Sequence, residues 1–223
     1  ATNQFIRLFS IYLPGTQANL DSRFELLISC INNSDSKELG FKAIEHSLKL
    51  DNVYFGGAEK FGTIELQHYQ PNPKEIIDYW TKVLNILLDE IKNKGNLENT
   101  SYSIIAHSVR SIYRHGFFKV IIPFIAEIIS LGKAEWDEML DALCLIRDYD
   151  FDTCNYYKTE ILDFIDKLQG HDFISRFKLI SDYKRNRKLL DIKAENSLDY
   201  FKQEYSKLAE EFVNEKIPIE TIK

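Results

Sequence analysis

The stretch "PKEIIDYWTKVLNILLDEIKNK", residues 73–94, decides the fold. Its apolar residues recur every three or four positions, which is the pattern of a helix with one buried face. They are Ile76, Ile77, Trp80, Val83, Leu84, Leu87, Leu88 and Ile91. Asn72 and Pro73 suit the N-cap and the first helical position, and Gly95 suits the C′ position. The stretch therefore predicts a long amphipathic helix that ends just before Gly95.

The flanking sequence repeats this pattern. Residues 20–33 and 37–50 each carry an apolar face, and Ser34 or Ser36 in the polar turn between them can cap the second helix. Such a pair is expected to fold back on itself as an antiparallel hairpin. Further helices are expected at residues 5–13, 99–115, 117–131, 134–149, 155–169, 171–183 and 195–215, with a cap near Asn99 or Thr100 and stops at Gly116, Gly132 and Gly170.

These elements together predict an all-α fold. Short connections between helices with one apolar stripe each favour stacked hairpins over a compact bundle. We expect an irregular HEAT-like array of antiparallel helical hairpins that forms a single helical-repeat domain over residues 1–223. A subdivision into residues 1–95 and 96–223 is the alternative.

One ordered non-helical loop, at about residues 51–72, is expected to interrupt the array. Its sequence, "DNVYFGGAEKFGTIELQHYQPN", is too apolar for a solvated linker, and residues 63–69 alternate as in a short strand. We expect a small hairpin that turns at Gly56 and Gly57 or at Gly62. Phe55 and Phe61 would anchor it against the helix that contains Trp80, with Glu65, Gln67 and Tyr69 facing outward. The loop is either a structural plug or a contact with a partner, and in the second case these five residues, Phe55, Phe61, Glu65, Gln67 and Tyr69, are the candidate binding residues.

The segment "ELLISCINNSDSKELGFKAIEHSL", residues 25–48, resembles a HEAT-type repeat. The features that carry the resemblance are an apolar pair on the first helix, an acidic turn residue and an apolar face on the second helix: Leu26, Leu27, Asp35, Leu39, Ala43 and Leu48. The proline and arginine that are usual at such turns are replaced by Ser36 and Gly40.

A broader resemblance covers roughly residues 8–90. The entry "LFSIYLPGTQANLDSR", the helix pair ending in "ELGFKAIEHSLKLDN", the loop containing Phe and Gly, and the helix with "IIDYWTKVL" occur in this order. This order resembles the helical C-terminal regions of large bacterial STAND-type, NLR-like ATPases. The resemblance implies the sensor or scaffold region of an anti-phage or signalling ATPase, whose nucleotide-binding and effector domains lie elsewhere. The first residues, "ATNQ", include no methionine, which suggests a tag remnant or a fragment cut from a longer protein.

Composition narrows the class of protein. Hydrophobic residues make up 44% of the chain, enough for a sizeable core, and the net charge of −6 disfavours general nucleic-acid binding. Cys30, Cys144 and Cys154 have no metal-binding or redox spacing, so we interpret them as reduced thiols of a cytoplasmic protein. The apolar runs at residues 5–13 and 117–131 are too short to span a bilayer, and no membrane partner is expected.

Motifs for cofactors and catalysis are missing from the sequence. "FGGAEKFG", residues 55–62, has three glycines and a lysine, but it precedes a strand-like stretch and not a helix N-terminus, which a phosphate cradle requires. Asp148, Asp150 and Asp152 alternate as in a calcium loop, but threonines stand at the positions that need glycine and glutamate. His107 and His115 lie two helical turns apart, about 12 Å, which is too far to share a metal. We therefore expect no cofactor, no metal and no catalytic residue.

Two segments carry opposite charge. Residues 134–166 contain ten acidic and two basic residues, and residues 171–193 contain seven basic and three acidic residues. They are either solvated surfaces or opposed patches for binding. The candidate basic patch consists of Arg176, Lys184, Arg185, Arg187 and Lys188.

The sequence favours a non-catalytic recognition or scaffold segment of a larger bacterial protein, which binds a protein partner or other domains of the same chain. Stacked hairpins expose long surfaces that suit protein binding and contain no built-in chemistry. The first alternative is a nucleic-acid-binding module that uses residues 176–193; its affinity would fall steeply as salt rises. The second is an unrecognised hydrolase, which needs a cleft with two acidic groups close together.

Overall fold

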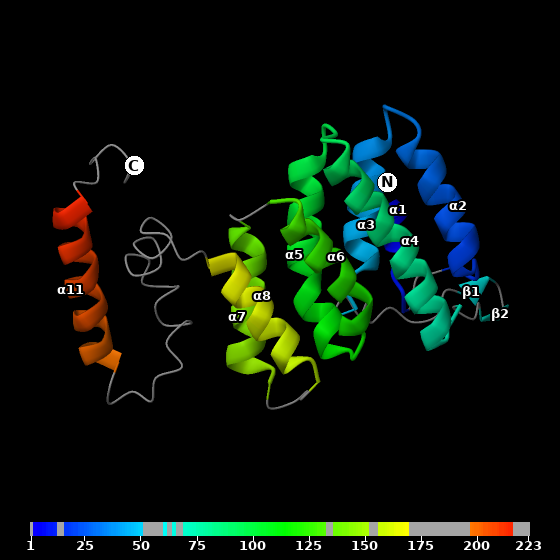
Figure 1. Ribbon diagram of the computed structural model, residues 1–223. Helices are drawn as coiled ribbons and strands as arrows, with labels where there is room; N and C mark the ends of the chain where they lie inside the picture. Colours follow the sequence, from blue (N-terminus) through cyan, green and yellow to red (C-terminus); the bar gives the residue numbers. More distant parts are fainter. Residues whose placement is uncertain are drawn as a thin grey trace. The chain divides into compact units, whose positions relative to one another are not determined.

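The computed structural model describes residues 2–12, 16–50, 60–61, 64–65, 69–132, 136–151, 156–169 and 197–215 (Figure 1). Its helices are α1 (Thr2–Arg7), α2 (Leu20–Ile31), α3 (Lys37–Ser47), α4 (Pro73–Lys92), α5 (Glu98–Arg114), α6 (Phe118–Ser130), α7 (Asp137–Tyr149), α8 (Lys158–Gln169) and α11 (Ser197–Glu215). Two two-residue strands, β1 (Lys60–Phe61) and β2 (Ile64–Glu65), form an antiparallel pair. The prediction of an all-α fold is confirmed.

Helix α4 follows the prediction closely at its start. The Asn72 side chain accepts a hydrogen bond from the backbone N–H of Glu75, and the Glu75 carboxylate accepts one from the backbone N–H of Asn72, at 3.0 and 2.8 Å. This capping box satisfies two N–H groups that the helix itself leaves unpaired. The predicted apolar face is buried except for Ile77, which is 40% exposed, and Tyr79 is buried in addition. The Trp80 indole N–H donates to the backbone oxygen of Ser47 at 2.9 Å and so ties α4 to the end of α3.

The end of α4 differs from the prediction by one residue. Lys94, and not Gly95, follows the C-cap Asn93 with a positive φ of 50°. The N–H of Gly95 bonds to the oxygen of Glu90 at 2.9 Å, and that of Lys94 bonds to Ile91 at 3.1 Å, which together make a Schellman motif. Gly95 is therefore the second residue past the cap. The predicted glycine stops Gly116 and Gly132 are confirmed, with φ of 81° and 85°, and Gly170 lies outside the described residues.

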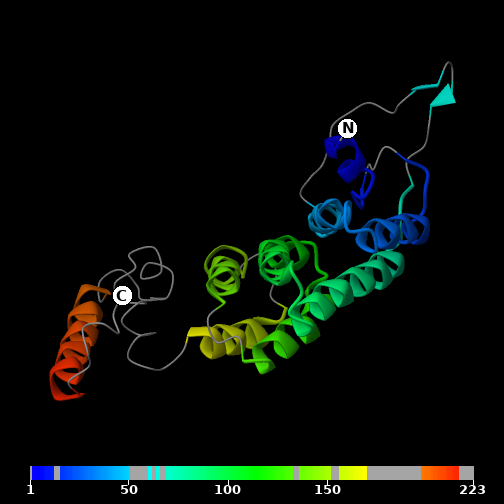
Figure 2. The same cartoon turned by 90° about the horizontal axis from the view of Figure 1, so that it is seen from above.

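The helices of residues 1–130 form stacked hairpins. Helix α2 packs on α3 and α4 packs on α5; between these pairs, α2 packs on α4, α3 on α5 and α4 on α6. Figure 2 shows the result as two layers, with α2, α4 and α6 in one and α3 and α5 in the other. Gly40 permits the close approach within the first hairpin, because a Cβ there would lie 2.9 Å from the Ile31 side chain. The assignment of this stack to the HEAT-like class stays a prediction.

The chain divides into two compact units, residues 1–130 and 131–223. In the second unit α7 packs on α8. The boundary lies after α6, whereas the sequence suggested residues 95 and 96 as the alternative boundary. The difference arises because α4 packs on both α5 and α6, so the first unit continues beyond Gly95.

Two helix predictions are wrong, the bounds of the first helix and the cap of α5. The expected buried helix at residues 5–13 is instead α1, which ends at Arg7 and buries none of its residues; Phe9 and Ile11, each 1% exposed, follow it in a turn. Helix α5 begins at Glu98 and has no side-chain cap at Asn99 or Thr100. Its N-cap is Leu97, whose N–H is accepted at 3.0 Å by the Glu90 carboxylate from α4. Ser36 is the N-cap of α3, but its hydroxyl donates to the oxygen of Cys30 and not to α3.

The paired strands in the loop place Lys60 opposite Glu65 and Phe61 opposite Ile64. Gly62, one of the positions where a turn was expected, lies between these strands in the sequence but outside the described residues. Residues 51–59, 62–63 and 66–68, and with them the anchoring roles expected for Phe55 and Phe61, lie outside what the structure describes. The expected helix at residues 171–183 also lies outside the described residues, and α11 falls within the expected residues 195–215.

Candidate recognition site

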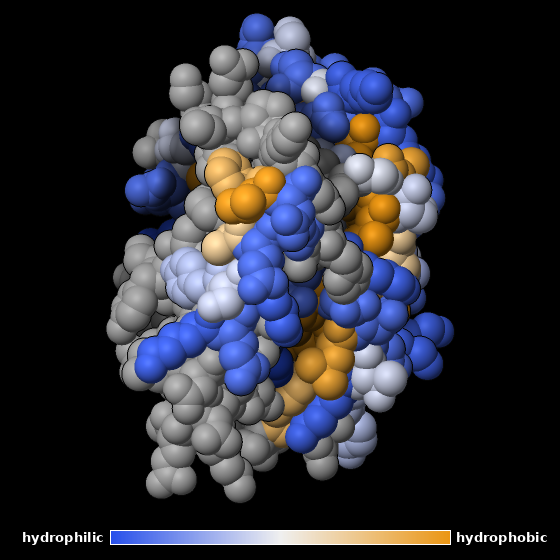
Figure 3. All heavy atoms as spheres, turned by 60° about the vertical axis from the view of Figure 1, so that its left-hand side comes forward, coloured by the Kyte–Doolittle hydropathy of each residue, from blue (hydrophilic) through white to orange (hydrophobic). Residues whose placement is uncertain are grey.

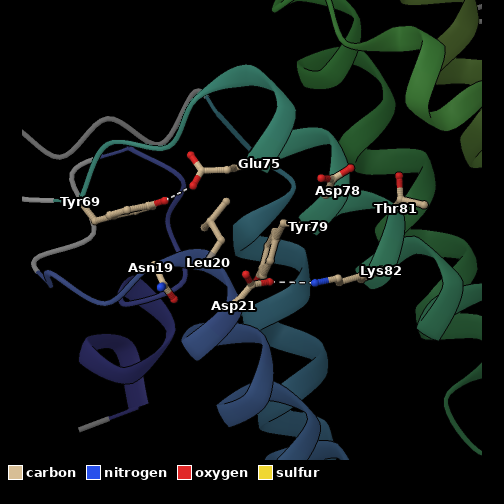
Figure 4. Close-up of a pocket in the computed structure, with 9 residues that line it drawn as sticks. All are labelled: Asn19, Leu20, Asp21, Tyr69, Glu75, Asp78, Tyr79, Thr81 and Lys82. Atoms are coloured by element: carbon tan, nitrogen blue, oxygen red, sulfur yellow. Dashed lines mark hydrogen bonds and ion pairs between the residues drawn. The ribbon is translucent and has the colours of Figure 1, made fainter.

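A pocket of about 350 Å³ lies at the base of the non-helical loop (Figure 4). It is lined by Asn19, Leu20, Asp21, Tyr69, Glu75, Asp78, Tyr79, Thr81 and Lys82. These residues come from three places: the first turn of α2, the end of the loop and the first three turns of α4. The packing of α2 on α4 brings the first and third of these places together.

Tyr69 forms one wall of the pocket and is held by three contacts. Its hydroxyl donates to the Glu75 carboxylate, its N–H donates to the oxygen of Thr16 at 3.2 Å, and the Arg23 guanidinium lies 5.7 Å from the centre of its ring. The hydrogen bond with Glu75 raises the pKa of Tyr69, and the same bond, together with that from Asn72 N–H, lowers the pKa of Glu75. Glu75 is thus fixed in place and kept ionised.

Arg23 supports this wall from inside the protein. It is only 3% exposed, although it carries a charge. Its Nε donates to the oxygen of Ala18 at 2.8 Å and its Nη1 donates to the oxygen of Ser10 at 2.9 Å, while its Nη2 is buried without a hydrogen-bond partner. Burial lowers the pKa of Arg23, and no carboxylate pairs with it among the described residues. The guanidinium joins the N-terminal segment, α2 and Tyr69.

Tyr79 lies beneath the pocket and belongs to the core. It is 2% exposed, and burial raises its pKa to about 12. Ser47 and Arg23 lie close enough to lower that pKa in part, but the Ser47 hydroxyl donates to the oxygen of Ile44 at 2.8 Å. The Tyr79 hydroxyl is buried and has no hydrogen-bond partner among the described residues. Its ring also meets the Phe24 ring edge to face, at 6.3 Å between centres.

The charge of the pocket is negative. Asp21, Glu75 and Asp78 contribute three carboxylates, and Lys82 contributes one ammonium, which pairs with Asp21 at 2.8 Å. Figure 4 shows this pair and the pair of Tyr69 with Glu75 on opposite sides of the pocket. Carboxylates and an aromatic ring around a concave site suit a cationic group.

The same geometry does not favour acid–base catalysis. A carboxyl that acts as a general acid near neutral pH needs a raised pKa. The pKa of Glu75 is lowered, and its two oxygens already accept hydrogen bonds from Tyr69 and Asn72. Glu75 is therefore poorly suited to be the proton donor that the hydrolase alternative requires.

The structure describes only some of the candidate residues that the sequence suggested. Of the loop set, Tyr69 lines the pocket, Phe61 and Glu65 are described only as backbone in β1 and β2, and Phe55 and Gln67 lie outside the described residues. The whole candidate basic patch, Arg176, Lys184, Arg185, Arg187 and Lys188, also lies outside them. Tyr69 was expected to face outward; it is half-buried and lines the pocket.

Several residues of the patterns that resembled metal sites have other contacts or are buried, and Asp152 lies outside the described residues. Asp148 pairs with Arg147 at 2.7 Å and Asp150 is buried, while His115 Nδ1 lies 2.8 Å from the oxygen of Ser111. In the part of the chain that the structure describes, no three His, Cys, Asp or Glu side chains gather as metal ligands would. Within that same part, no helix is both long and apolar enough to cross a bilayer.

Exposed apolar residues do not single out a second site. The large ones include Leu26 and Ile77 in the first unit and Tyr149, Tyr156 and Leu162 in the second. On the face drawn in Figure 3, apolar side chains appear as several patches with hydrophilic side chains between them.

The pocket has no signal in the sequence because its lining comes from residues about fifty positions apart. One signal was available for Arg23: it stands between Leu20 and Leu27 on the apolar face of α2, where an arginine must find partners within the fold. Comparison of the chain with protein-family models, with curated proteins and with solved structures finds no match.

Proposed function

We propose that this chain is a non-catalytic recognition or scaffold module, and that the pocket at the base of the loop engages a basic side chain of a protein partner or of another domain. One observation carries the proposal: Tyr69, from the segment expected to make the contact, shares a pocket with three carboxylates and one ammonium.

Preorganisation supports this proposal. A site that is fixed before binding loses less conformational entropy when the ligand arrives. Arg23 beneath the ring and Glu75 at the hydroxyl hold Tyr69 in place, and the capping box holds Glu75. Asp78 lies one turn further along α4, on the same side of the helix as Glu75 and Lys82. A guanidinium or ammonium entering the pocket would meet charged oxygens whose positions are already set.

The larger protein in this proposal is a bacterial STAND-type, NLR-like ATPase, in which the stacked hairpins serve as a sensor or scaffold region. The resemblance over residues 8–90 supports it. The sequence of the full-length protein provides the test: a phosphate-binding motif, G-x-x-x-x-G-K-[ST], upstream of these residues is the expected finding. The absence of such a motif from the full-length protein would refute its assignment to this class of ATPase.

The pocket can be tested with a fluorescent hexa-arginine peptide and, as its neutral counterpart, hexa-citrulline. We expect the 223-residue chain to bind the first and not the second. Asp78→Asn should weaken binding about three- to tenfold, since one charge pair at an exposed site contributes about 1 kcal/mol. Asp89→Asn is the matched control, because Asp89 lies on the exposed side of the same helix outside the pocket. Equal affinity of both variants and the unaltered chain would refute the assignment of the pocket.

A further inference from the structure

Lys82 is a cation of the chain itself that lines the proposed pocket. Its ammonium pairs with the Asp21 carboxylate at 2.8 Å and lies 5.3 Å from the centre of the Phe24 ring. Figure 4 shows the Lys82 side chain, on α4, extended toward Asp21 on α2. A carboxylate and an aromatic ring are also the groups with which the pocket would hold a basic side chain of a partner. Lys82 therefore occupies the place at Asp21 that such a side chain would take.

The three carboxylates of the pocket differ in what they already bind. Glu75 accepts from the Tyr69 hydroxyl, and Asp21 is paired with Lys82. Asp78 is exposed, and among the residues that the structure describes no ion pair engages it. A cation that enters the pocket can therefore bind Asp78 directly, but it reaches Asp21 only by displacing Lys82.

The ion pair that must open is a weak one. The side chains of Lys82 and Asp21 are 46% and 79% exposed, so water and salt screen their attraction. The pair joins the first turn of α2 to the third turn of α4 at the surface and leaves the core between these helices untouched. It is thus a contact that a ligand can exchange for its own.

We propose that Lys82 competes with the ligand's cation for Asp21 and thereby makes the pocket selective for arginine over lysine; this inference rests on the proposed function of the pocket. A lysine ligand only exchanges one ammonium for another at Asp21. A guanidinium can donate two parallel hydrogen bonds to that carboxylate and can stack flat on the Tyr69 ring, which a compact ammonium does not. Lys82 therefore cancels most of the attraction of Asp21 for lysine and less of its attraction for arginine.

Fluorescent hexa-arginine and hexa-lysine peptides, titrated into the 223-residue chain at constant ionic strength, test this selectivity. The unaltered chain should bind hexa-arginine more tightly than hexa-lysine. Lys82→Gln should raise the affinity for hexa-lysine about fivefold and the affinity for hexa-arginine about twofold, within the range of one exposed charge pair. The preference for arginine should accordingly fall by about a factor of two.

Lys92→Gln is the matched control on the same helix. Lys92 also pairs with a carboxylate of a neighbouring helix, Glu127 of α6, and both side chains are similarly exposed, at 40% and 43%. It lies about 15 Å along α4 from Lys82, which is further than exposed charges interact at physiological ionic strength. This variant should leave both affinities and their ratio unchanged. Thermal unfolding followed by circular dichroism should show both variants to be folded.

Equal gains for the two peptides in Lys82→Gln would overturn the proposal, because they would report only the loss of one positive charge. No gain for either peptide would overturn it as well. In both cases the binding of hexa-arginine by the unaltered chain would stand, and the proposed pocket with it. If neither the unaltered chain nor Lys82→Gln binds either peptide, the pocket itself is refuted together with the role of Lys82.

Discussion

Arg23 contacts the N-terminal segment, α2 and Tyr69, and so links three parts of the first unit. A buried guanidinium is costly unless its donors find acceptors. Two of its nitrogens bond to the backbone oxygens of Ala18 and Ser10, and its Cζ lies 5.7 Å from the centre of the Tyr69 ring. The charge is thus solvated by carbonyl groups and a ring, and the third nitrogen stays unpaired.

Replacing Arg23 by glutamine should therefore be strongly destabilising. The shorter side chain cannot reach both oxygens, and leaving buried carbonyl groups unpaired costs about 2–4 kcal/mol in total. Urea unfolding followed by circular dichroism gives the loss in free energy of unfolding. Lys42→Gln, at an exposed position of α3, is the control and should change it by less than about 0.5 kcal/mol. A loss below about 1 kcal/mol for Arg23→Gln would show that the carbonyl contacts contribute little.

Gly95 was expected to end α4 as its C′ residue, but its role is to leave space beside the Glu90 carboxylate. A Cβ at residue 95 would lie 2.1 Å from Oε1 of Glu90. That carboxylate accepts from the Lys37 ammonium and from Leu97 N–H, each at 3.0 Å, and so connects α3, α4 and the start of α5. The glycine leaves room for this junction between the two hairpins.

Gly95→Ala should push the Glu90 carboxylate away and cost about 1–2 kcal/mol of unfolding free energy, because the Lys37 and Leu97 donors lose their acceptor. The same substitution in a Glu90→Ala background should cost little, since there is no carboxylate left to displace. Equal costs in both backgrounds, measured by urea unfolding, would locate the effect in the backbone instead.

At the scale of elements, the sequence predicted what depends on neighbouring residues. The three-four spacing around Trp80 and the cap signal of Asn72 and Pro73 are local, and α4 begins where they indicate. The cap of α5 is not local: Glu90 supplies it from another helix, so the search for a cap at Asn99 or Thr100 missed it. The predicted end of the first helix is wrong for the same reason. The segment after α1 is held by bonds of Ser10 to Arg23 of α2 and His46 of α3, which are distant in the sequence.

The loop can be tested as an element. Replacing residues 56–62 by a Gly-Ser bridge keeps Tyr69, Asn72 and Glu75, which fix the end of the loop. We therefore expect the chain to stay folded, with a melting temperature by circular dichroism within a few degrees of the unaltered one. Unfolding of the shortened chain would mean that the loop is a structural plug and would remove it as a contact with a partner.

At the scale of the whole molecule, residues 1–130 enclose a core of their own. The two layers of helices bury Trp80, Leu84, Ile105, Ile112 and Ile125 at their contacts. Each hairpin packs mainly on its neighbour, as expected for a stack in which no single helix can bury its apolar face alone.

Residues 1–130, produced alone, should accordingly fold. We expect a cooperative thermal transition and amide signals of α2–α6 that coincide with those of the full chain. A broad transition, or signals collapsed into the range of an unfolded chain, would show that the first unit needs residues 131–223.

A second acidic region of the chain can also attract a cation, since residues 134–166 carry ten acidic residues. Where a cation binds is therefore the most direct test of the proposed recognition site. N-acetyl-arginine amide, titrated into the isotope-labelled chain and followed by NMR, reports the position of binding residue by residue. The account predicts shifts that cluster at Asp21, Tyr69, Glu75, Asp78 and Lys82 and disappear with the citrulline analogue. Shifts confined to α7 and α8, or no saturable shifts, would contradict it.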